Sequence, residues 1–128
     1  MKYRVEKTIE VAGAHQLNLD YESPCRNMHG HNWMITVCCE AEELDRHGMV
    51  VDFSLLRMAV MKLDHSILGA SADLPNTTAE SIGAWVMHQV DDLLHAKVSR
   101  SKAQGARPGK CVEVRVRESR DNLCVVTS

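Results

Sequence analysis

The chain has 128 residues, 45% of them hydrophobic and 25% charged, values that predict a single compact domain over residues 1–128. A formal net charge of −2 and an aromatic content of 4% argue against a nucleic-acid-binding protein, which needs a positive field and aromatic stacking surfaces. No apolar run approaches the length of a membrane span, so we expect no membrane partner.

The cysteines indicate a reducing compartment. There are five of them, an odd number, and no two are arranged as C-x-x-C. The first residues alternate in charge and lack the apolar segment of a secretory signal. We therefore expect reduced thiols, a cytoplasmic location and no thiolate zinc finger.

Alternating apolar and polar residues predict two strands in the first third of the chain. Over residues 3–11 the odd positions are apolar except for Lys7, and the even positions are polar or charged. Over residues 33–39 the odd positions again share an apolar phase. Such alternation is typical of half-buried strands. The segment 18–28, which contains Pro24, is the expected connecting loop.

Two helices are expected in the middle of the chain. Apolar residues at helical spacing predict the first over residues 53–63, with Asp52 or Ser54 as its N-cap. The second is expected over residues 78–95. Residues 77–80, Thr-Thr-Ala-Glu, have the spacing of a capping box at its start.

The last third predicts a loop and two strands. Residues 97–110 are basic and contain Gly and Ser, which indicates a loop, either solvated or in contact with a phosphorylated substrate. Val112, Val114 and Val116 alternate with charged residues and predict a strand, and another is expected over 122–127. The order ββααββ is typical of an α+β domain whose mainly antiparallel sheet carries two helices on one face. Open sheet edges favour an oligomer, and subunits could close a barrel by pairing their edges.

The motif His29-Gly30-His31 carries the most information about function. Side chains alternate in a strand, so the two imidazoles point the same way from Cα atoms about 7 Å apart. The pair continues the apolar phase of the second strand, and His15 continues that of the first. Three such nitrogens would make a zinc site with one open position, the arrangement of catalytic zinc. The alternative is two ordinary histidines that are hydrogen-bonded at the end of a sheet.

Cys25, in the polar loop before the histidine pair, has three interpretations. It could be the fourth ligand of a closed Cys-His₃ zinc site, a thiolate activated by a nearby metal or imidazole, or a small buried residue. Asp64 and His65 place a carboxylate beside an imidazole, which can set the tautomer and proton affinity of the ring.

Glu118 continues the phase of the valines in the strand before it, so it would bring a carboxylate to the end of an apolar face. A carboxylate there can accept two parallel N–H bonds from a guanidinium-like group, such as the edge of a pterin or guanine. The alternative is that the strand has ended and the side chain is solvated.

Taken together, these residues resemble the 6-pyruvoyltetrahydropterin synthase family, which includes the bacterial 6-carboxy-5,6,7,8-tetrahydropterin synthases of queuosine biosynthesis. The resemblance spans nearly the whole chain. Six blocks match the family in order: residues 11–15, 25–31, 48–53, 63–68, 76–80 and 118–119.

The resemblance implies the tunnelling fold, assembled as a homo-hexamer of two stacked trimeric barrels with active sites between subunits. It implies that His15, His29 and His31 hold Zn²⁺. The substrate it implies is a small-molecule pterin triphosphate.

The resemblance also implies catalytic and binding roles. Cys25 would be the general base, with Asp64 and His65 as its partners in proton transfer. Glu118 would anchor the pterin ring, and Thr78 would contribute from a neighbouring subunit.

The reaction implied is a zinc-dependent lyase reaction that converts 7,8-dihydroneopterin triphosphate to 6-carboxy-5,6,7,8-tetrahydropterin, acetaldehyde and triphosphate, for 7-deazaguanine and queuosine biosynthesis. Three residues separate Cys25 from His29, as in the carboxy-forming bacterial enzymes. One alternative is the pyruvoyl-forming synthase, which eliminates triphosphate without cleaving the side chain, and another is action on a related pterin. A third is a non-catalytic, zinc-stabilised oligomer with Cys25 as the fourth ligand.

Overall fold

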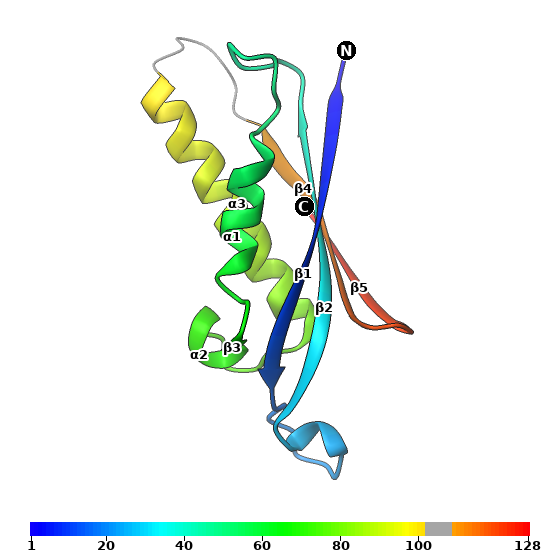
Figure 1. The fold of residues 1–128 in the computed structure, drawn as a ribbon. Helices are drawn as coiled ribbons and strands as arrows, with labels where there is room; N and C mark the ends of the chain where they lie inside the picture. The colour runs from blue at the N-terminus through cyan, green and yellow to red at the C-terminus, as the bar shows by residue number, and fades with distance from the viewer. Residues whose placement is uncertain (102–108) are drawn as a thin grey trace.

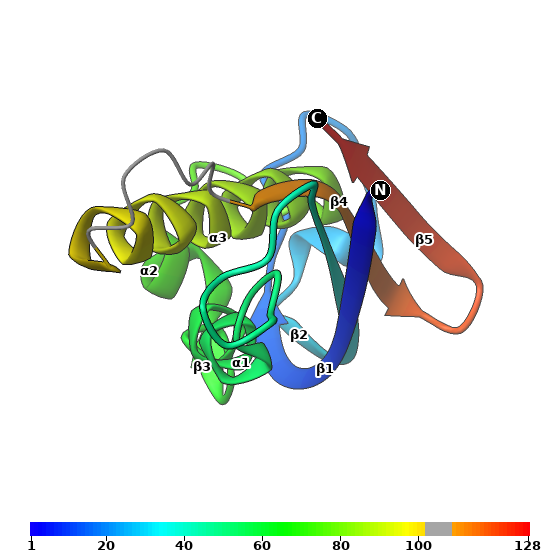
Figure 2. The ribbon, with the colours of Figure 1, turned by 90° about the horizontal axis from the view of Figure 1, so that it is seen from above.

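The computed structural model describes residues 1–101 and 109–128 of the chain. They form one five-stranded sheet, in the order β3-β1-β2-β4-β5, with the two longer helices, α1 and α3, packed on one of its faces (Figures 1 and 2). In chain order the elements are β1 (Tyr3–His15), the 3-10 helix η1 (Pro24–Arg26), β2 (His29–Ala41), α1 (Phe53–Met61), β3 (Ser66–Ile67), α2 (Leu68–Ala72), α3 (Ala79–Ser101), β4 (Lys110–Ser119) and β5 (Asn122–Thr127).

The long hairpin of β1 and β2 is the part of the fold that positions the site. The two strands pair antiparallel from Tyr3 opposite Ala41 to His15 opposite His29. Both strands were predicted, and both extend further toward the connecting loop than the alternation alone indicated. The odd residues of both strands face the helices, so the histidines at the end of the hairpin share the buried face.

The helices cover the sheet with apolar residues at helical spacing. The buried apolar residues of α1 and α3 form one core with the odd-numbered residues of β1 and β2, among them the fully buried Trp33. Of the two predicted caps for α1, Asp52 is the N-cap, since its carboxylate accepts from the Ser54 amide at 2.9 Å. For α3 the cap is Thr78, whose hydroxyl accepts from the Ser81 amide at 3.2 Å.

The capping box predicted over residues 77–80 is therefore wrong by one residue. Thr77 lies outside α3, and the cap bond runs from Ser81 to Thr78 rather than involving Glu80. Because Thr77 and Thr78 are adjacent, either could be the N-cap as far as the sequence shows. In the structure only Thr78 stands at the start of the helix. The Glu80 side chain therefore takes no part in the cap bond.

The sheet differs from the predicted antiparallel arrangement at one edge. Two residues, Ser66 and Ile67, form β3 and pair parallel with Gly13 and Ala14 of β1, and the short helix α2 follows directly. The sheet is therefore mixed. Two-residue strands have no periodicity of their own, which explains why the sequence pattern does not predict β3.

The second half of the chain corrects two boundaries. Residues 97–101, predicted as loop, belong to α3, because the chain has no Gly or Pro to break the helix before Gly105. Of the rest of the predicted loop, residues 102–108 lie outside the described residues, and Lys110 is already the first residue of β4. Within the described ranges, no helix combines the length and the apolar composition needed to cross a bilayer.

Strand β4 contains a bulge that changes its predicted phase. Cys39 pairs with Cys111 and Cys38 with Glu113, which leaves Val112 as an extra residue. Cys111 is consequently fully buried and Val112 only partly so. The expected single phase of the valines therefore begins after the bulge, at Val114, and it continues toward Glu118.

Candidate functional site

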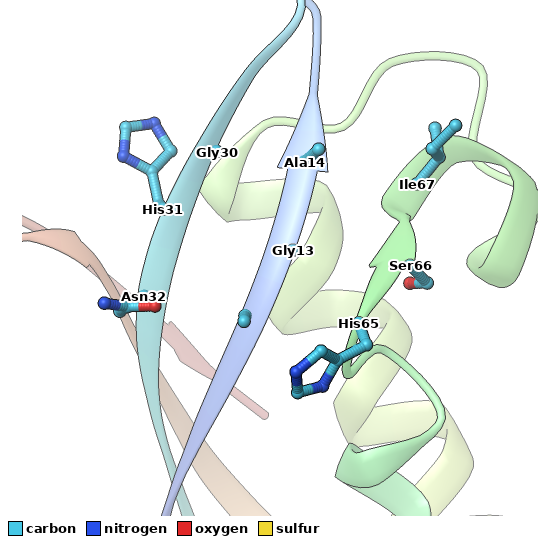
Figure 3. Close-up of a pocket in the computed structure, with 9 residues that line it drawn as sticks. Gly13, Ala14, Gly30, His31, Asn32, His65, Ser66 and Ile67 are labelled. Atoms are coloured by element: carbon cyan, nitrogen blue, oxygen red, sulfur yellow. The ribbon is translucent and has the colours of Figure 1, made fainter.

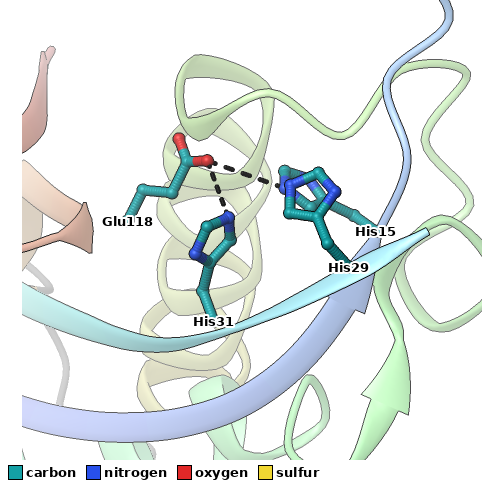
Figure 4. Close-up of side chains that lie close together, drawn as sticks. All are labelled: His15, His29, His31 and Glu118. Carbon is teal, nitrogen blue, oxygen red and sulfur yellow. Dashed lines mark ion pairs between the residues drawn. The ribbon is translucent and has the colours of Figure 1, made fainter. Parts of the chain in front are cut away.

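Three histidines and one glutamate converge at the end of the sheet where the β1–β2 hairpin opens into its loop. His15 is the last residue of β1, directly opposite His29, and His31 lies opposite Gly13. One ligand atom from each of the three histidines and from Glu118 lies within 4.8 Å of the others (Figure 4). The sequence predicted the three histidines to meet, and the structure brings them together.

Backbone carbonyls orient two of these rings. The Nδ1 atom of His15 lies 2.8 Å from the Thr77 carbonyl oxygen, and that of His29 lies 2.6 Å from the Asn27 carbonyl oxygen. A carbonyl oxygen only accepts, so each Nδ1 carries the proton and each Nε2 keeps a lone pair. Burial lowers the pKa of His15, which favours the neutral ring. Both rings are thus prepared to act as metal ligands through Nε2.

The ring nitrogens at the centre of the cluster lack hydrogen-bond partners. Among the described residues, the Nε2 atoms of His15 and His31 are buried and make no hydrogen bond. Glu118 Oε1 lies 3.0 Å from Nε2 of His31 and 3.7 Å from Nε2 of His15, but neither contact has hydrogen-bond geometry. A buried polar atom without a partner costs about 1–3 kcal/mol. Three neutral nitrogens and a carboxylate fit Zn²⁺, which would remove this cost.

Glu118 is the fourth member of the cluster. Its side chain is 24% exposed and points toward the three rings, so the solvated alternative does not describe it (Figure 4). Glu118 alternates with the buried Val114 and Val116 along β4, so its carboxylate shares their face of the sheet. The structure therefore places Glu118 where it could contact either a metal or a substrate bound to that metal.

Trp33 supports the cluster from the core, a role that the sequence pattern did not indicate. The indole is fully buried, and its Nε1–H donates to the Gly13 carbonyl oxygen at 3.1 Å. The ring centroids of His15 and His31 lie 4.9 Å and 5.2 Å from that of Trp33, in edge-to-face arrangement. The alternation identified Trp33 only as a core residue; its position two residues after His31 was the available signal.

Cys25 lies in η1, in the loop that joins the two histidine-bearing strands. Its carbonyl oxygen accepts from the Leu17 amide at 2.7 Å, and its amide donates to the Ser23 hydroxyl at 3.2 Å. The thiol is partly exposed and is not a member of the four-residue cluster. The side chain that completes the cluster in this chain is that of Glu118, not Cys25.

Asp64 and His65 form the predicted carboxylate–imidazole pair. The Nδ1–H of His65 donates to Asp64 Oδ2 at 2.7 Å, and the other carboxylate oxygen accepts from the Ala12 amide at 2.9 Å. The Ala12 amide, followed by the His65 ring, lowers the pKa of Asp64. His65 has a φ of 52°, in the left-handed region, and its amide donates to the Ala12 carbonyl at 2.6 Å. The pair is therefore anchored to the edge of β1.

The pair lies away from the histidine cluster of the same chain. His65 lines a shallow hollow of about 460 Å³ whose lining also includes Ala12, Ala14, Asn32 and one residue of the cluster, His31. Ala12, Ala14 and Asn32 alternate with the cluster histidines along their strands, so their side chains face the other side of the sheet. In Figure 3, strands β2 and β1 lie between the rings of His31 and His65. Neither Asp64 nor His65 belongs to the four-residue cluster of its own chain.

A second hollow, of about 320 Å³, adjoins the cluster on its acidic side. Its walls include His15, Glu118, Thr78, Glu80 and Cys124. Thr78 lines this hollow together with Glu118 of the same chain. Its contribution to the site of a neighbouring subunit, which the resemblance implies, stays a prediction. Glu80, predicted only as part of a capping box, lies here as well. Both residues lie at the start of α3, which begins at Ala79.

Another group with metal-ligating atoms, made by Glu6, Cys38 and Glu113, lies on the sheet face that the helices leave open. It already contains two cations: Arg4 pairs with both glutamates, and so does Arg115. Burial, as the largest cause, raises the pKa of Cys38 to about 11. This group is a satisfied ion-pair network around a neutral thiol, which makes it a poor site for a further cation.

Comparison with known proteins agrees with this geometry. The family model for 6-pyruvoyl tetrahydropterin synthase matches residues 4–128. The 6-carboxy-5,6,7,8-tetrahydropterin synthase of Synechocystis sp. is 32% identical over 97 residues, which cover 69% of this chain and 74% of that protein. The protein of the same name from Bacillus subtilis is 25% identical over 130 residues, covering 96% of this chain and 84% of that one.

The fold also matches a solved structure. The Caenorhabditis elegans 6-pyruvoyl tetrahydropterin synthase superposes with a TM-score of 0.71 at 18% identity, covering 100% of this chain and 96% of that chain. At this identity the match concerns the fold alone. Together with the family match over almost the whole sequence, it confirms the resemblance drawn from the motifs. The chain belongs to the 6-pyruvoyl tetrahydropterin synthase family.

Proposed function

We propose that this chain is a zinc-dependent carbon–carbon lyase. It converts 7,8-dihydroneopterin triphosphate and water to 6-carboxy-5,6,7,8-tetrahydropterin, acetaldehyde and triphosphate, as a step toward 7-deazaguanines such as queuosine. The observation that carries the proposal is the three-histidine cluster, with its unpartnered Nε2 atoms, in a chain whose relatives in Synechocystis sp. and Bacillus subtilis are named for this activity.

In this proposal His15, His29 and His31 hold Zn²⁺ through their Nε2 atoms. Zinc bound there would act as a Lewis acid and polarise the hydroxyl groups of the substrate side chain. Glu118 lies beside the cluster and next to the acidic hollow, where its carboxylate and the Thr78 hydroxyl can accept N–H bonds from the pterin ring.

Cys25 is the proposed general base, which removes a proton from a side-chain carbon next to a polarised hydroxyl. Asp64 and His65 are its proposed partners in proton transfer. Asp64 holds the proton of His65 on Nδ1, so Nε2 of that ring is free to accept or deliver a proton. The ring is 83% exposed in the single chain, so it is open to a second molecule.

The separation of Asp64 and His65 from the cluster supports an active site made between subunits. We propose a homo-hexamer of two stacked trimeric barrels, in which this pair from one subunit faces the cluster of a neighbour. Within the described residues, β5 pairs with β4 alone, and most of the other edge of β1 is unpaired beyond its two-residue contact with β3. Both sheet edges are thus available for the edge-to-edge pairing that closes a barrel.

Two alternatives differ from the proposal in specific ways. A pyruvoyl-forming synthase would use the same zinc and pterin contacts but keep the side-chain carbons; the short spacing of Cys25 and His29 and the names of the relatives favour the carboxy-forming reaction. A non-catalytic zinc oligomer with Cys25 as fourth ligand has less support, because Glu118 completes the cluster.

Product analysis tests the proposed reaction. The zinc-loaded protein is incubated with 7,8-dihydroneopterin triphosphate, and the products are identified by mass spectrometry with a separate assay for acetaldehyde. We expect 6-carboxy-5,6,7,8-tetrahydropterin and acetaldehyde in equal amounts. A tetrahydropterin that keeps all the side-chain carbons would assign the chain to the pyruvoyl-forming reaction. Unchanged substrate would contradict both the carboxy-forming and the pyruvoyl-forming reactions.

A further inference from the structure

The buried His15 ring lies in the wall of two hollows that differ in charge. The hollow described above contains the carboxylates of Glu80 and Glu118 and, further out, that of Asp121. The other, of about 520 Å³, has Arg26 in its lining and no carboxylate among its described lining residues. We refer to it as the Arg26 hollow. His15 therefore lies between a hollow that is lined by carboxylates and a hollow that is lined by an arginine.

Short loop contacts build the Arg26 hollow. The bond from the Leu17 amide to the Cys25 carbonyl holds η1 against the end of β1. Elsewhere in its lining, the Asn18 amide donates to the Asn76 side-chain oxygen at 3.1 Å, and the Asn76 side-chain nitrogen donates to the Asn18 carbonyl at 3.4 Å. The loop after β1 and the loop before α3 are thus joined, which fixes this part of the lining.

The guanidinium of Arg26 is available to a ligand. Its one described partner is Glu22, at 3.1 Å from Nη1, and the Glu22 side chain is 98% exposed. Exposed ion pairs of this kind contribute little, because water screens them and two long side chains must be held in one geometry. The planar guanidinium of arginine matches phosphate oxygens with two parallel N–H bonds.

We propose that the Arg26 hollow binds the triphosphate arm of the substrate, with Arg26 as the residue that selects for phosphorylation. This inference rests on the proposed function. The parts of the substrate follow the same order as the parts of the site. The guanidine-like edge of the pterin ring suits the acidic hollow, and the hydroxylated side chain belongs at the cluster. The triphosphate, a polyanion, is at the other end, where the Arg26 hollow lies. Because Arg26 directly follows Cys25, triphosphate binding would also hold the proposed base in place.

Inorganic tripolyphosphate is the probe that tests this site without any turnover. Isothermal titration calorimetry measures its affinity for the zinc-loaded oligomer of the wild type, Arg26→Gln and Arg57→Gln. Arg57 is exposed on α1, so its variant removes the same charge elsewhere. We expect Arg26→Gln to weaken binding about tenfold or more and Arg57→Gln to leave it unchanged. Equal binding by Arg26→Gln and wild type, or no binding by the wild type, overturns the assignment.

Two further variants keep the result interpretable if Arg26→Gln folds poorly. Glu22→Gln removes the competing carboxylate and is expected to bind tripolyphosphate more tightly than the wild type; weaker binding contradicts the proposal. Arg26→Lys keeps the charge and is expected to recover part of the affinity. Because tripolyphosphate is not transformed, this result stands even where the product assay shows a different reaction.

Discussion

The imidazole rings of His15 and His29 face each other across the β1–β2 hairpin, with their centroids 4.5 Å apart. Each ring donates its Nδ1–H to a loop carbonyl: His15 to that of Thr77, in the loop before α3, and His29 to that of Asn27, in the loop between β1 and β2. The strand register therefore sets the spacing of the two imidazole rings, and the loop carbonyls set the rotation of each ring. Rings that are held in this way are already oriented for metal binding in the metal-free protein.

Removal of one cluster histidine should abolish stoichiometric zinc binding. We expect His31→Ala to lose zinc affinity by more than the roughly 10- to 100-fold that follows loss of an outer-shell partner, because a direct ligand is removed. Metal content after gel filtration measures this. His88→Ala, on the exposed side of α3, is the matched control and should retain zinc. Full occupancy in His31→Ala would disprove the assignment of that ligand.

Trp33→Phe should destabilise the fold near the cluster. The substitution removes the donor to the Gly13 carbonyl and leaves a small void, for an expected loss of about 1–3 kcal/mol in the free energy of unfolding. Urea unfolding of the zinc-free protein measures it. Trp85→Phe, at a half-buried position on α3, should cost less. Equal costs at the two positions would show that the indole bond contributes nothing specific.

Asp64→Asn should impair turnover while zinc binding remains intact. An amide in place of the carboxylate no longer requires the proton of His65 to reside on Nδ1. We expect product formation to fall roughly a hundredfold or more. Nitrogen NMR of the His65 ring would report the change of tautomer directly. Asp92→Asn, exposed on α3, is the control. Unaltered turnover and tautomer in Asp64→Asn would remove the pair from the mechanism.

The lowered pKa of Asp64 also predicts a pH dependence of stability. A carboxyl whose pKa is lower in the folded than in the unfolded state stabilises the fold above the unfolded value. That stabilisation is lost as the pH falls below the ordinary value of 3.8 and through the folded pKa. We expect the difference in unfolding free energy between wild type and Asp64→Asn, measured without zinc, to shrink over this acidic range. A difference that stays constant there would mean that Asp64 is not coupled to folding.

Gly83→Ala should separate α3 from the sheet. A Cβ at this helix position would lie 2.7 Å from Val126 Cγ2 and 3.3 Å from Val116 Cγ2, and β-branched side chains have little freedom to move. Overpacking of this kind costs typically about 1–3 kcal/mol. Gly69→Ala, whose Cβ would meet its nearest neighbour at 3.7 Å, is the control and should be neutral or slightly stabilising. Thermal unfolding of both variants compares them; a neutral Gly83→Ala would argue against the close packing.

The hairpin and its histidines were predictable because alternation is a local property. A side chain's phase in a strand follows from its position alone, so the odd residues of the first strand carry His15 to the same face as His31. The family resemblance then added roles for Cys25, Asp64 and Glu118 that alternation cannot supply. Those roles remain predictions, although the structure places Glu118 at the cluster.

Other features depend on contacts between distant segments, which a local pattern does not contain. The bulge at Val112 arises from pairing with β2. The two-residue strand β3 exists only because β1 offers it an edge. Both are decided by tertiary packing rather than by propensity. The α3 cap is a different case: two adjacent threonines give the same local pattern, and the structure shows that Thr78 is the cap.

Zinc K-edge X-ray absorption on the zinc-loaded protein identifies the atoms bound to the metal, and so distinguishes an open three-histidine site from a closed one. We expect a first shell of nitrogen and oxygen at about 2.0–2.2 Å, with three imidazoles and no sulfur. A sulfur at about 2.3 Å would place Cys25 in the coordination sphere. That result would contradict an open, catalytic zinc site and support a closed structural one.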